Sequence, residues 1–339
     1  MYTFAKPALL KSTVIAALFP LILTACNKNQ DAAAPAAETP ASKTVATGAE
    51  DATCATVKFA DIGWTDITAT TALSSSVLTG LGYKPESTIA SVPIAFAGLK
   101  KGQIDAFLGY WSPSMTPIVE PFTKENAITV LDKPNLVGAK YTLAVPKYAY
   151  DAGLKTFADI GKFTKELDGK IYGIEPGNDG NKLIADMITK DAFGLKSFKM
   201  VESSEAGMLT EVSRSAKDKK WIVFLGWAPH PMNVQQDIVY LSGGDDFFGP
   251  NYGEAKVYTV TSNDLAKRCP NVNKLVTNLE FNVGMENEVM LPIMDKTNPN
   301  EAAKAWLAKN PATLDAWLAG VNTVDGKPGL EAVKKYLGV

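Results

Sequence analysis

Residues 57–81 read VKFADIGWTDITATTALSSSVLTGL, and this stretch decides the fold. Residues 57–62 have the β-branched and aromatic content of a buried strand. A helix is predicted over 65–81, because its apolar residues recur at mostly helical spacing; they are Ile67, Leu73, Val77, Leu78 and Leu81. A strand that runs into a helix is the repeating unit of an α/β fold.

The same alternation continues along the chain. Further strands are predicted at 89–95, 104–110, 141–146, 170–175, 198–202, 221–227 and 258–260. Further helices are predicted at 157–167, 181–193, 205–217, 263–279, 284–295, 299–309 and 312–319. The pattern predicts an α/β protein with a largely parallel sheet, large enough for two lobes.

Composition narrows the possible functions. The 339 residues include 34 Lys+Arg and 36 Asp+Glu, for a net charge of −2. With only two arginines, Arg214 and Arg268, the chain lacks the basic footprint of a nucleic-acid-binding protein. A single histidine and three scattered cysteines do not form a zinc-site pattern. We therefore expect no metal and no cofactor.

The N-terminus has the features of an export signal. Lys6 and Lys11 precede an apolar stretch at 13–25 that is too short to span a membrane. The sequence Leu-Thr-Ala-Cys at 23–26 resembles a bacterial lipoprotein box, in which Cys26 would carry the lipid; ordinary signal cleavage is the alternative. Residues 26–53 are rich in alanine and lack aromatics, which predicts a flexible tether. The expected location is periplasmic or cell-envelope, with a lipid anchor on a membrane.

Two cysteines remain after Cys26. In an exported protein Cys54 and Cys269 either form a disulfide or stay as two free buried thiols. A disulfide would join 54–139 and 245–339 into a first lobe, with 140–244 as a second lobe inserted into it. Two chain crossings, near 136–140 and 241–248, would then form a hinge beside a cleft.

Aromatic residues follow predicted strands at equivalent places in both lobes. Trp64, Trp111 and Trp227 each lie at or just after the end of a predicted strand, with a glycine one or two residues before, and Tyr141 opens another strand. A single tryptophan of this kind usually belongs to the core, but three in equivalent positions favour a ligand site. Several aromatic faces suit a quaternary ammonium ion, which is attracted by the ring quadrupole. Sugars would need more polar side chains than these loops carry.

Four motifs together resemble a known family. They are Gly-Trp-Thr-Asp at 63–66, Gly-Tyr-Trp at 109–111, Pro-Gly-Asn-Asp-Gly at 176–180 and Gly-Trp-Ala-Pro-His at 226–230. This set is similar to the periplasmic binding proteins of ABC importers for choline and glycine betaine, and most similar to those for choline. The resemblance spans most of residues 54–339. It implies a two-lobed periplasmic-binding-protein fold of type II-like topology.

The resemblance also implies roles for individual residues. Trp64, Trp111, Tyr141 and Trp227 would form an aromatic cage, with Asp66 and Asn178 at the polar end of the ligand. The Cys54–Cys269 disulfide matches the family as well. The implied partners are a permease and its ATPase, and the protein is expected to be a monomer.

The polar end of the site distinguishes choline from betaine. Asp66 can accept a hydrogen bond from the hydroxyl of choline but would repel the carboxylate of betaine. Asp66 could instead serve the N-terminus of the predicted helix. His230 could contact a betaine carboxylate, or it could be structural; Asn178 could shape its glycine-rich turn, or hold Asp66 or the ligand hydroxyl.

Other functional classes receive less support. An exported hydrolase using His230 would need a serine nucleophile, and no Gly-x-Ser-x-Gly elbow is present. The sequence therefore predicts a receptor that is not an enzyme. Choline is the preferred ligand, glycine betaine or proline betaine is the alternative, and a sensor role is not distinguished from transport.

Overall fold

The computed structural model describes residues 50–339. Its strands are β1 (Thr56–Asp61), β2 (Lys84–Ile89), β3 (Ala106–Ser112), β4 (Ile128–Pro146), β5 (Lys170–Tyr172), β6 (Lys199–Val201), β7 (Phe224–Ala228), β8 (Ile238–Tyr240) and β9 (Glu254–Ser262). The first helices are α1 (Thr65–Gly80), α2 (Val92–Lys100), α3 (Thr116–Lys124), α4 (Lys147–Asp151), α5 (Phe157–Ile160), α6 (Asp179–Thr189), α7 (Glu205–Lys217) and α8 (Met232–Gln235). The remaining helices are α9 (Asp245–Phe248), α10 (Pro250–Gly253), α11 (Leu265–Arg268), α12 (Pro270–Asn278), α13 (Val283–Met294), α14 (Pro299–Lys309), α15 (Thr313–Trp317) and α16 (Gly329–Leu337). Three 3₁₀ turns complete the set: η1 (Ala52–Cys54), η2 (Gly161–Phe163) and η3 (Ala192–Gly194).

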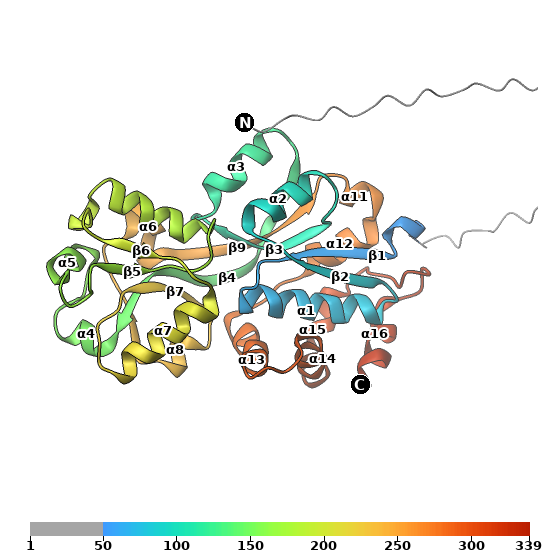
Figure 1. Cartoon of the computed structure of the whole chain (residues 1–339). Helices are drawn as coiled ribbons and strands as arrows, with labels where there is room; N and C mark the ends of the chain where they lie inside the picture. Colours follow the sequence, from blue (N-terminus) through green and yellow to red (C-terminus); the bar gives the residue numbers. More distant parts are fainter. Residues whose placement is uncertain (1–49) are drawn as a thin grey trace, which may run out of the picture. The chain divides into compact units, whose positions relative to one another are not determined.

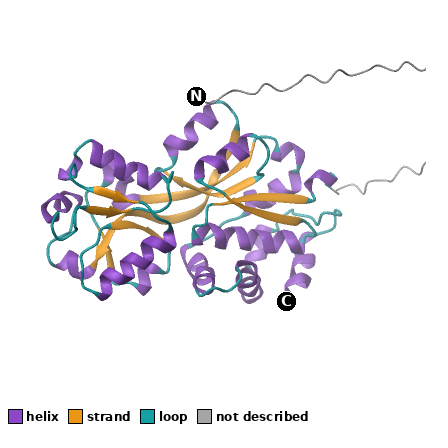
Figure 2. Ribbon diagram, viewed as in Figure 1, coloured by secondary structure: helices purple, strands orange, loops and turns teal. Residues whose placement is uncertain are grey.

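The strands form one mixed sheet with helices on both faces (Figure 2). The strand order is β2-β1-β3-β9-β4-β7-β5-β6, with β8 paired to β4. Pairs at both outer ends are parallel, whereas β3–β9, β9–β4 and β4–β7 are antiparallel. The α/β class is confirmed, but the expectation of a largely parallel sheet is not, because two long central strands run in opposite directions.

The two lobes lie at opposite ends of this sheet (Figure 1). We use first lobe for β1, β2 and β3 with α1, α2 and α13 to α16, and second lobe for β5, β6 and β7 with α5, α6 and α7. Strands β4 and β9 run between the two lobes. Lys140 on β4, for example, pairs with Glu254 on β9 and with Ala228 on β7 of the second lobe. The boundaries at 139–140 and 244–245 stay a prediction.

Helix α1 carries the first pocket residues, and it is buried on most sides. It packs against α13, α14 and α16 as well as the sheet. Some of its hydroxyl groups bond within the helix: Thr70 donates to Asp66 O at 3.1 Å, Ser74 to Thr70 O at 2.8 Å and Thr79 to Ser75 O at 2.8 Å. Such bonds allow Ser and Thr inside a buried helix.

Several predicted elements differ from the structure. The strand predicted at 89–95 is wrong: Ile89 ends β2, and Val92 begins α2 with Pro93 in its first turn, where proline fits a helix. A short apolar run cannot by itself separate the two structures. The helix predicted at 263–279 is divided at Pro270 into α11 and α12. The helix predicted at 157–167 is only α5 and η2, and α3 and α16 were not predicted.

A disulfide joins Cys54 to Cys269 across 215 residues of sequence. Both residues are buried, Cys54 at the end of η1 and Cys269 between α11 and α12. The pairing predicted from export and from the family resemblance is thus present. It ties the beginning of the first lobe to a late segment of the chain.

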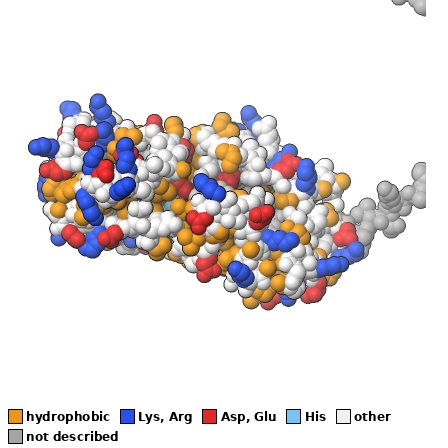
Figure 3. Space-filling model, turned by 60° about the horizontal axis from the view of Figure 1, so that its bottom comes forward, with side chains coloured by type: hydrophobic (Ala, Val, Ile, Leu, Met, Phe, Trp, Pro, Cys, Tyr) orange, Lys and Arg blue, Asp and Glu red, His pale blue; other side chains and the backbone are white. Residues whose placement is uncertain are grey.

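The predicted signal peptide at 1–25, the lipidation site Cys26 and most of the tether at 26–53 lie outside the described residues. Within residues 50–339, no helix is both long enough and apolar enough to cross a membrane. On the face drawn in Figure 3, acidic and basic side chains are interspersed, without an extended region of one sign.

Candidate ligand-binding site

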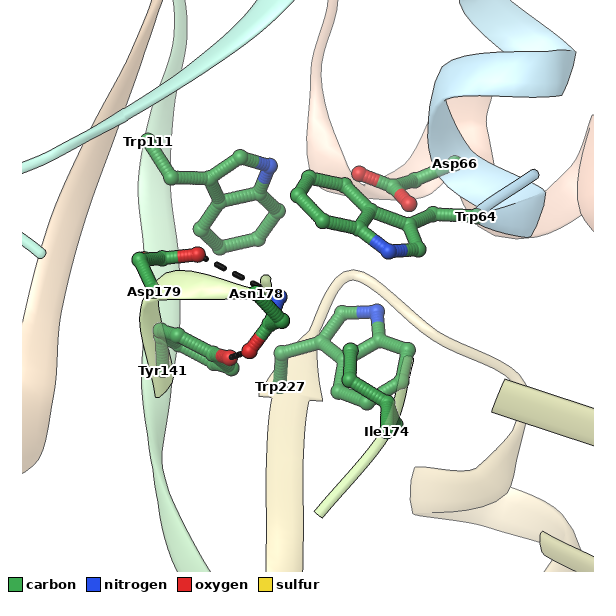
Figure 4. A pocket seen from close by; sticks show the side chains of 8 residues that line it. All are labelled: Trp64, Asp66, Trp111, Tyr141, Ile174, Asn178, Asp179 and Trp227. Carbon is green, nitrogen blue, oxygen red and sulfur yellow. Dashed lines mark hydrogen bonds between the residues drawn. The ribbon is translucent and has the colours of Figure 1, made fainter. Parts of the chain in front are cut away.

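A small cavity of about 20 Å³ lies where the two lobes meet (Figure 4). This volume is little more than one water molecule needs, so the side chains that line the cavity are closely packed. Eight residues line it: Trp64, Asp66, Trp111, Tyr141, Ile174, Asn178, Asp179 and Trp227. Six of them are the residues that the sequence analysis selected, and tertiary structure brings those six into one place.

The sheet and one helix N-terminus position the aromatic rings. Trp64 is the N-cap residue of α1, and Trp111 lies on β3. Tyr141 on β4 and Trp227 on β7 are direct partners in an antiparallel ladder, so their side chains lie next to each other. The ring centroid of Tyr141 lies 6.0 Å from that of Trp111 and 6.4 Å from that of Trp227.

The sequence had indicated that the aromatic residues lie at the ends of strands. In the structure three of them lie within strands. Trp111 lies within β3, because pairing with β9 continues through Trp111 and Ser112. Trp227 lies within β7 and Tyr141 well inside β4. Pairing carries β3 and β7 past their predicted ends and begins β4 well before its predicted start, yet the rings still converge.

Asn178 fixes the ring of Tyr141. The hydroxyl of Tyr141 donates to Asn178 Oδ1 at 2.9 Å, and Asn178 Oδ1 also accepts from the backbone N–H of Asn181 at 3.1 Å. Asn178 is therefore the N-cap of α6 and a support for the tyrosine. Its Nδ2 donates to Asp179 Oδ1 at 3.3 Å, not to Asp66.

Trp64 is held from the opposite lobe. Its indole Nε1–H donates to Glu175 Oε1 at 2.9 Å. Glu175 follows β5, and burial raises its pKa to about 7. The orientation of this ring therefore depends on how the two lobes are placed.

Two buried acids, Asp66 and Asp179, form the polar side of the cavity. Asp66 is 2% exposed, and its Oδ1 has no hydrogen-bond partner among the described residues. Burial, reinforced by the Glu205 carboxylate, raises the pKa of Asp66 to about 8. Burial also raises the pKa of Asp179 to about 6, and its Oδ2 has no partner among the described residues. The eight lining residues include no lysine, arginine or histidine.

His230 lies behind the cavity and does not line it. It is 1% exposed, and its ring centroid lies 5.0 Å from that of Trp227. Its Nε2 bonds Glu205 Oε1 at 3.1 Å, and its Nδ1 accepts from the backbone N–H of Met232 at 3.0 Å. This arrangement corresponds to the structural alternative for His230, because both ring nitrogens already have protein partners.

The sequence analysis missed several residues around the cavity. Asp179 directly follows Asn178 in a motif that was recognised, so its position was a usable signal. Ile174 and Glu175 precede the same motif. Glu205 had no signal beyond its place at the start of a predicted helix.

A buried site with four aromatic rings and two acids, and no cation, suits a small organic cation. Comparison with known proteins agrees. The family model for the substrate-binding domain of ABC-type glycine betaine transport systems matches residues 55–309.

Two solved structures of ABC-transporter choline-binding proteins are similar to this chain. One, in complex with choline, is 51% identical, has a TM-score of 0.84 and covers 85% of this chain and 100% of its own. The other, in an unliganded semi-closed conformation, is 52% identical, has a TM-score of 0.77 and has the same coverage.

A third relative is the glycine betaine/carnitine transport binding protein GbuC of Listeria monocytogenes. It is 31% identical over 169 residues, which are 50% of this chain and 54% of that protein. The two-lobed fold, the enclosed aromatic cavity and the family match lead to one conclusion. This chain belongs to the family of substrate-binding domains of ABC-type glycine betaine transport systems.

Proposed function

We propose that this protein captures choline in the aromatic cavity and delivers it to the permease of an ABC importer. The observation that carries the proposal is the pairing of four rings with two buried acids in a cavity without a cationic side chain. Trp64, Trp111, Tyr141 and Trp227 surround the trimethylammonium group, and Asp66 accepts a hydrogen bond from the choline hydroxyl.

The summed cation–π energy of such a cage can account for a large part of the binding free energy of a micromolar complex. Each desolvated contact between a cation and an aromatic face contributes about 0.5–2 kcal/mol. Four faces contribute about 2–8 kcal/mol, against about 8 kcal/mol for a micromolar complex. The acids add attraction for the positive charge in a site from which water is excluded.

Choline is preferred because of the polar end of the cavity. A betaine carboxylate beside Asp66 and Asp179 would meet two acids and no lysine or arginine. The hydroxyl of choline can donate a hydrogen bond to the free Oδ1 of Asp66. Asn178 acts on the ligand through Tyr141 and through its remaining amide N–H.

Glycine betaine or proline betaine is the second candidate. The matching family model describes glycine betaine transport, and the Listeria relative is a glycine betaine/carnitine protein. Protonated Asp66 could donate to a betaine carboxylate, since the pKa of Asp66 is raised to about 8. A betaine receptor would use the same cage.

The finer features of the receptor belong to this proposal. Residues 1–25 direct export, and a lipid on Cys26 with the tether at 26–53 holds the protein at a membrane on the periplasmic side. The protein acts as a monomer, not as an enzyme, and hinges between 54–139 with 245–339 and 140–244. Its partners are a permease and an ATPase.

A calorimetric titration of residues 27–339 with choline, and separately with glycine betaine, tests the proposal. Low-micromolar choline binding with much weaker betaine binding supports the cage and Asp66 together. The reverse order retains the cage but assigns an osmoprotectant ligand. Binding of neither compound contradicts the proposed function.

A further inference from the structure

Helix α1 begins without a side-chain cap of its own. Its N-cap residue is Trp64, whose side chain has no oxygen to accept from the first free N–H groups of the helix. The backbone N–H of Thr65 donates instead to Glu205 Oε2 at 2.9 Å. The hydroxyl of Thr65 donates to the other oxygen, Glu205 Oε1. A carboxylate 140 residues away in sequence therefore caps this helix.

His230 orients the carboxylate of Glu205. Since His230 Nδ1 accepts from the Met232 N–H at 3.0 Å, the ring proton is on Nε2, which donates to Glu205 Oε1 at 3.1 Å. Glu205 is 7% exposed and receives three donors, from Thr65 N–H, the Thr65 hydroxyl and His230. Oε1 accepts two of these hydrogen bonds and Oε2 accepts one.

The cap crosses from one lobe to the other. Thr65 begins α1 in the first lobe, while Glu205 begins α7 in the second lobe (Figure 1). The neighbours of Thr65 in sequence, Trp64 and Asp66, both line the cavity. The contact between Glu205 and Thr65 is therefore made at the same turn of backbone that carries Trp64 and Asp66.

We propose that Glu205, oriented by His230, is a positioning residue that latches the lobes together over a bound ligand and slows its release. In an open arrangement Glu205 would leave Thr65, so the latch contributes only when the lobes are closed. This inference rests on the proposed function, because it needs a ligand in the cavity.

Thr65→Pro is the sharpest variant, because it removes the N–H and the hydroxyl of residue 65 together. Proline is favoured in the first turn of a helix, and Trp64 before it already has φ −80° and ψ 137°, which suit a residue that precedes proline. Glu205→Ala removes the acceptor, and Glu205→Gln retains an oxygen for Thr65. Glu211→Ala is the matched control, since Glu211 on the same helix pairs only within α7, with Arg214.

Choline dissociation is measured by stopped-flow tryptophan fluorescence, with the melting temperature of each ligand-free variant as a check of folding. We expect Thr65→Pro and Glu205→Ala to release choline on the order of 10 to 100 times faster, with Glu205→Gln intermediate and association little changed. The double variant should be no worse than the more affected single variant. Glu211→Ala should behave as wild type.

Release at the wild-type rate by folded Thr65→Pro and Glu205→Ala would overturn the latch. So would fully additive effects in the double variant. A wild-type protein that binds neither choline nor betaine would instead contradict the proposed function, before any variant is compared.

Discussion

Gly180 lies so close to the Tyr141 ring that a β-carbon on Gly180 would lie 2.7 Å from Tyr141 Cζ. Gly180 is in the first turn of α6, just after Asn178, which holds the tyrosine hydroxyl. Leu225 on β7 closes the space from another side, at 2.9 Å from the same β-carbon. The position of this cage wall therefore requires a residue without a side chain.

Gly180→Ala should weaken choline binding by at least about tenfold, because the added methyl group displaces the Tyr141 ring. Calorimetric titration gives the dissociation constant. Gly284→Ala on α13 is the control, since its β-carbon would meet only Asn282 Oδ1, at 3.3 Å. Equal affinity for wild type and Gly180→Ala would mean that Tyr141 does not need its present position.

Two substitutions of Trp111 can distinguish the cation–π contribution of its ring face from the contribution of its volume to packing. Trp111 Nε1 is buried without a hydrogen-bond partner among the described residues, so a phenyl ring loses no bond there. We expect Trp111→Phe to retain binding within about threefold and Trp111→Leu to lose about tenfold or more. Trp306→Leu, on α14 outside the cavity, should bind as wild type. Indistinguishable affinities for the Phe and Leu variants would argue against a cation–π cage.

Asp66→Asn tests the negative charge of Asp66, because asparagine keeps an oxygen that can accept from the choline hydroxyl. Removing the charge should weaken choline binding by about tenfold and change betaine binding less, or improve it, because the repulsion of the betaine carboxylate disappears. Both ligands are titrated in parallel. Asp186→Asn is the matched control, as Asp186 on α6 is exposed and pairs with Lys190. An equal loss for the two ligands would remove Asp66 from the choice between them.

Binding should also release a proton. Burial first, and then the carboxylates of Glu205 and Asp61, raise the pKa of Asp66 to about 8. Burial first, and then Asp66 in turn, raise the pKa of Glu286 on α13. A bound cation favours the charged form of Asp66 and lowers its pKa. Ligand binding therefore strengthens as the pH rises towards 8 and then levels off.

Titrations at pH 6 to 9, in two buffers of different ionisation enthalpy, measure this linkage. Asp179, with a pKa raised to about 6, contributes at the acidic end. Asp66→Asn should flatten the profile between pH 7 and 8. A wild-type affinity that does not change over the range would contradict the assignment.

The disulfide should affect stability and leave the ligand unaffected. Closing a loop across 215 residues restricts the unfolded chain, so a Cys54→Ser/Cys269→Ser variant should lose about 2–5 kcal/mol of unfolding free energy. Neither cysteine lines the cavity, so choline affinity should be unchanged. Denaturant unfolding of the variant and of oxidised and reduced wild type provides the comparison. Identical midpoints would show that the bond contributes nothing.

The sequence alone determined the α/β class and most of the cavity. Strand β1 and helices α1 and α7 were predicted almost to the residue. The apolar residues of α7 recur with the helical period, whereas α1 is buried on most sides and its apolar residues follow that period only in part. The cage residues could be selected because three tryptophans occupy equivalent places in the two lobes and because the four motifs resemble a known family. The Cys54–Cys269 pair followed from export and from the family resemblance.

Only tertiary structure decided how the sheet closes and what holds the cage. Strands β4 and β9 pair residues more than a hundred positions apart, so no local pattern could reveal the antiparallel centre of the sheet. Glu205 caps α1 through contacts between lobes, and His230 supports it instead of facing the cavity. Local sequence encodes the elements, whereas partners distant in the chain are chosen by packing and hydrogen-bond satisfaction in three dimensions.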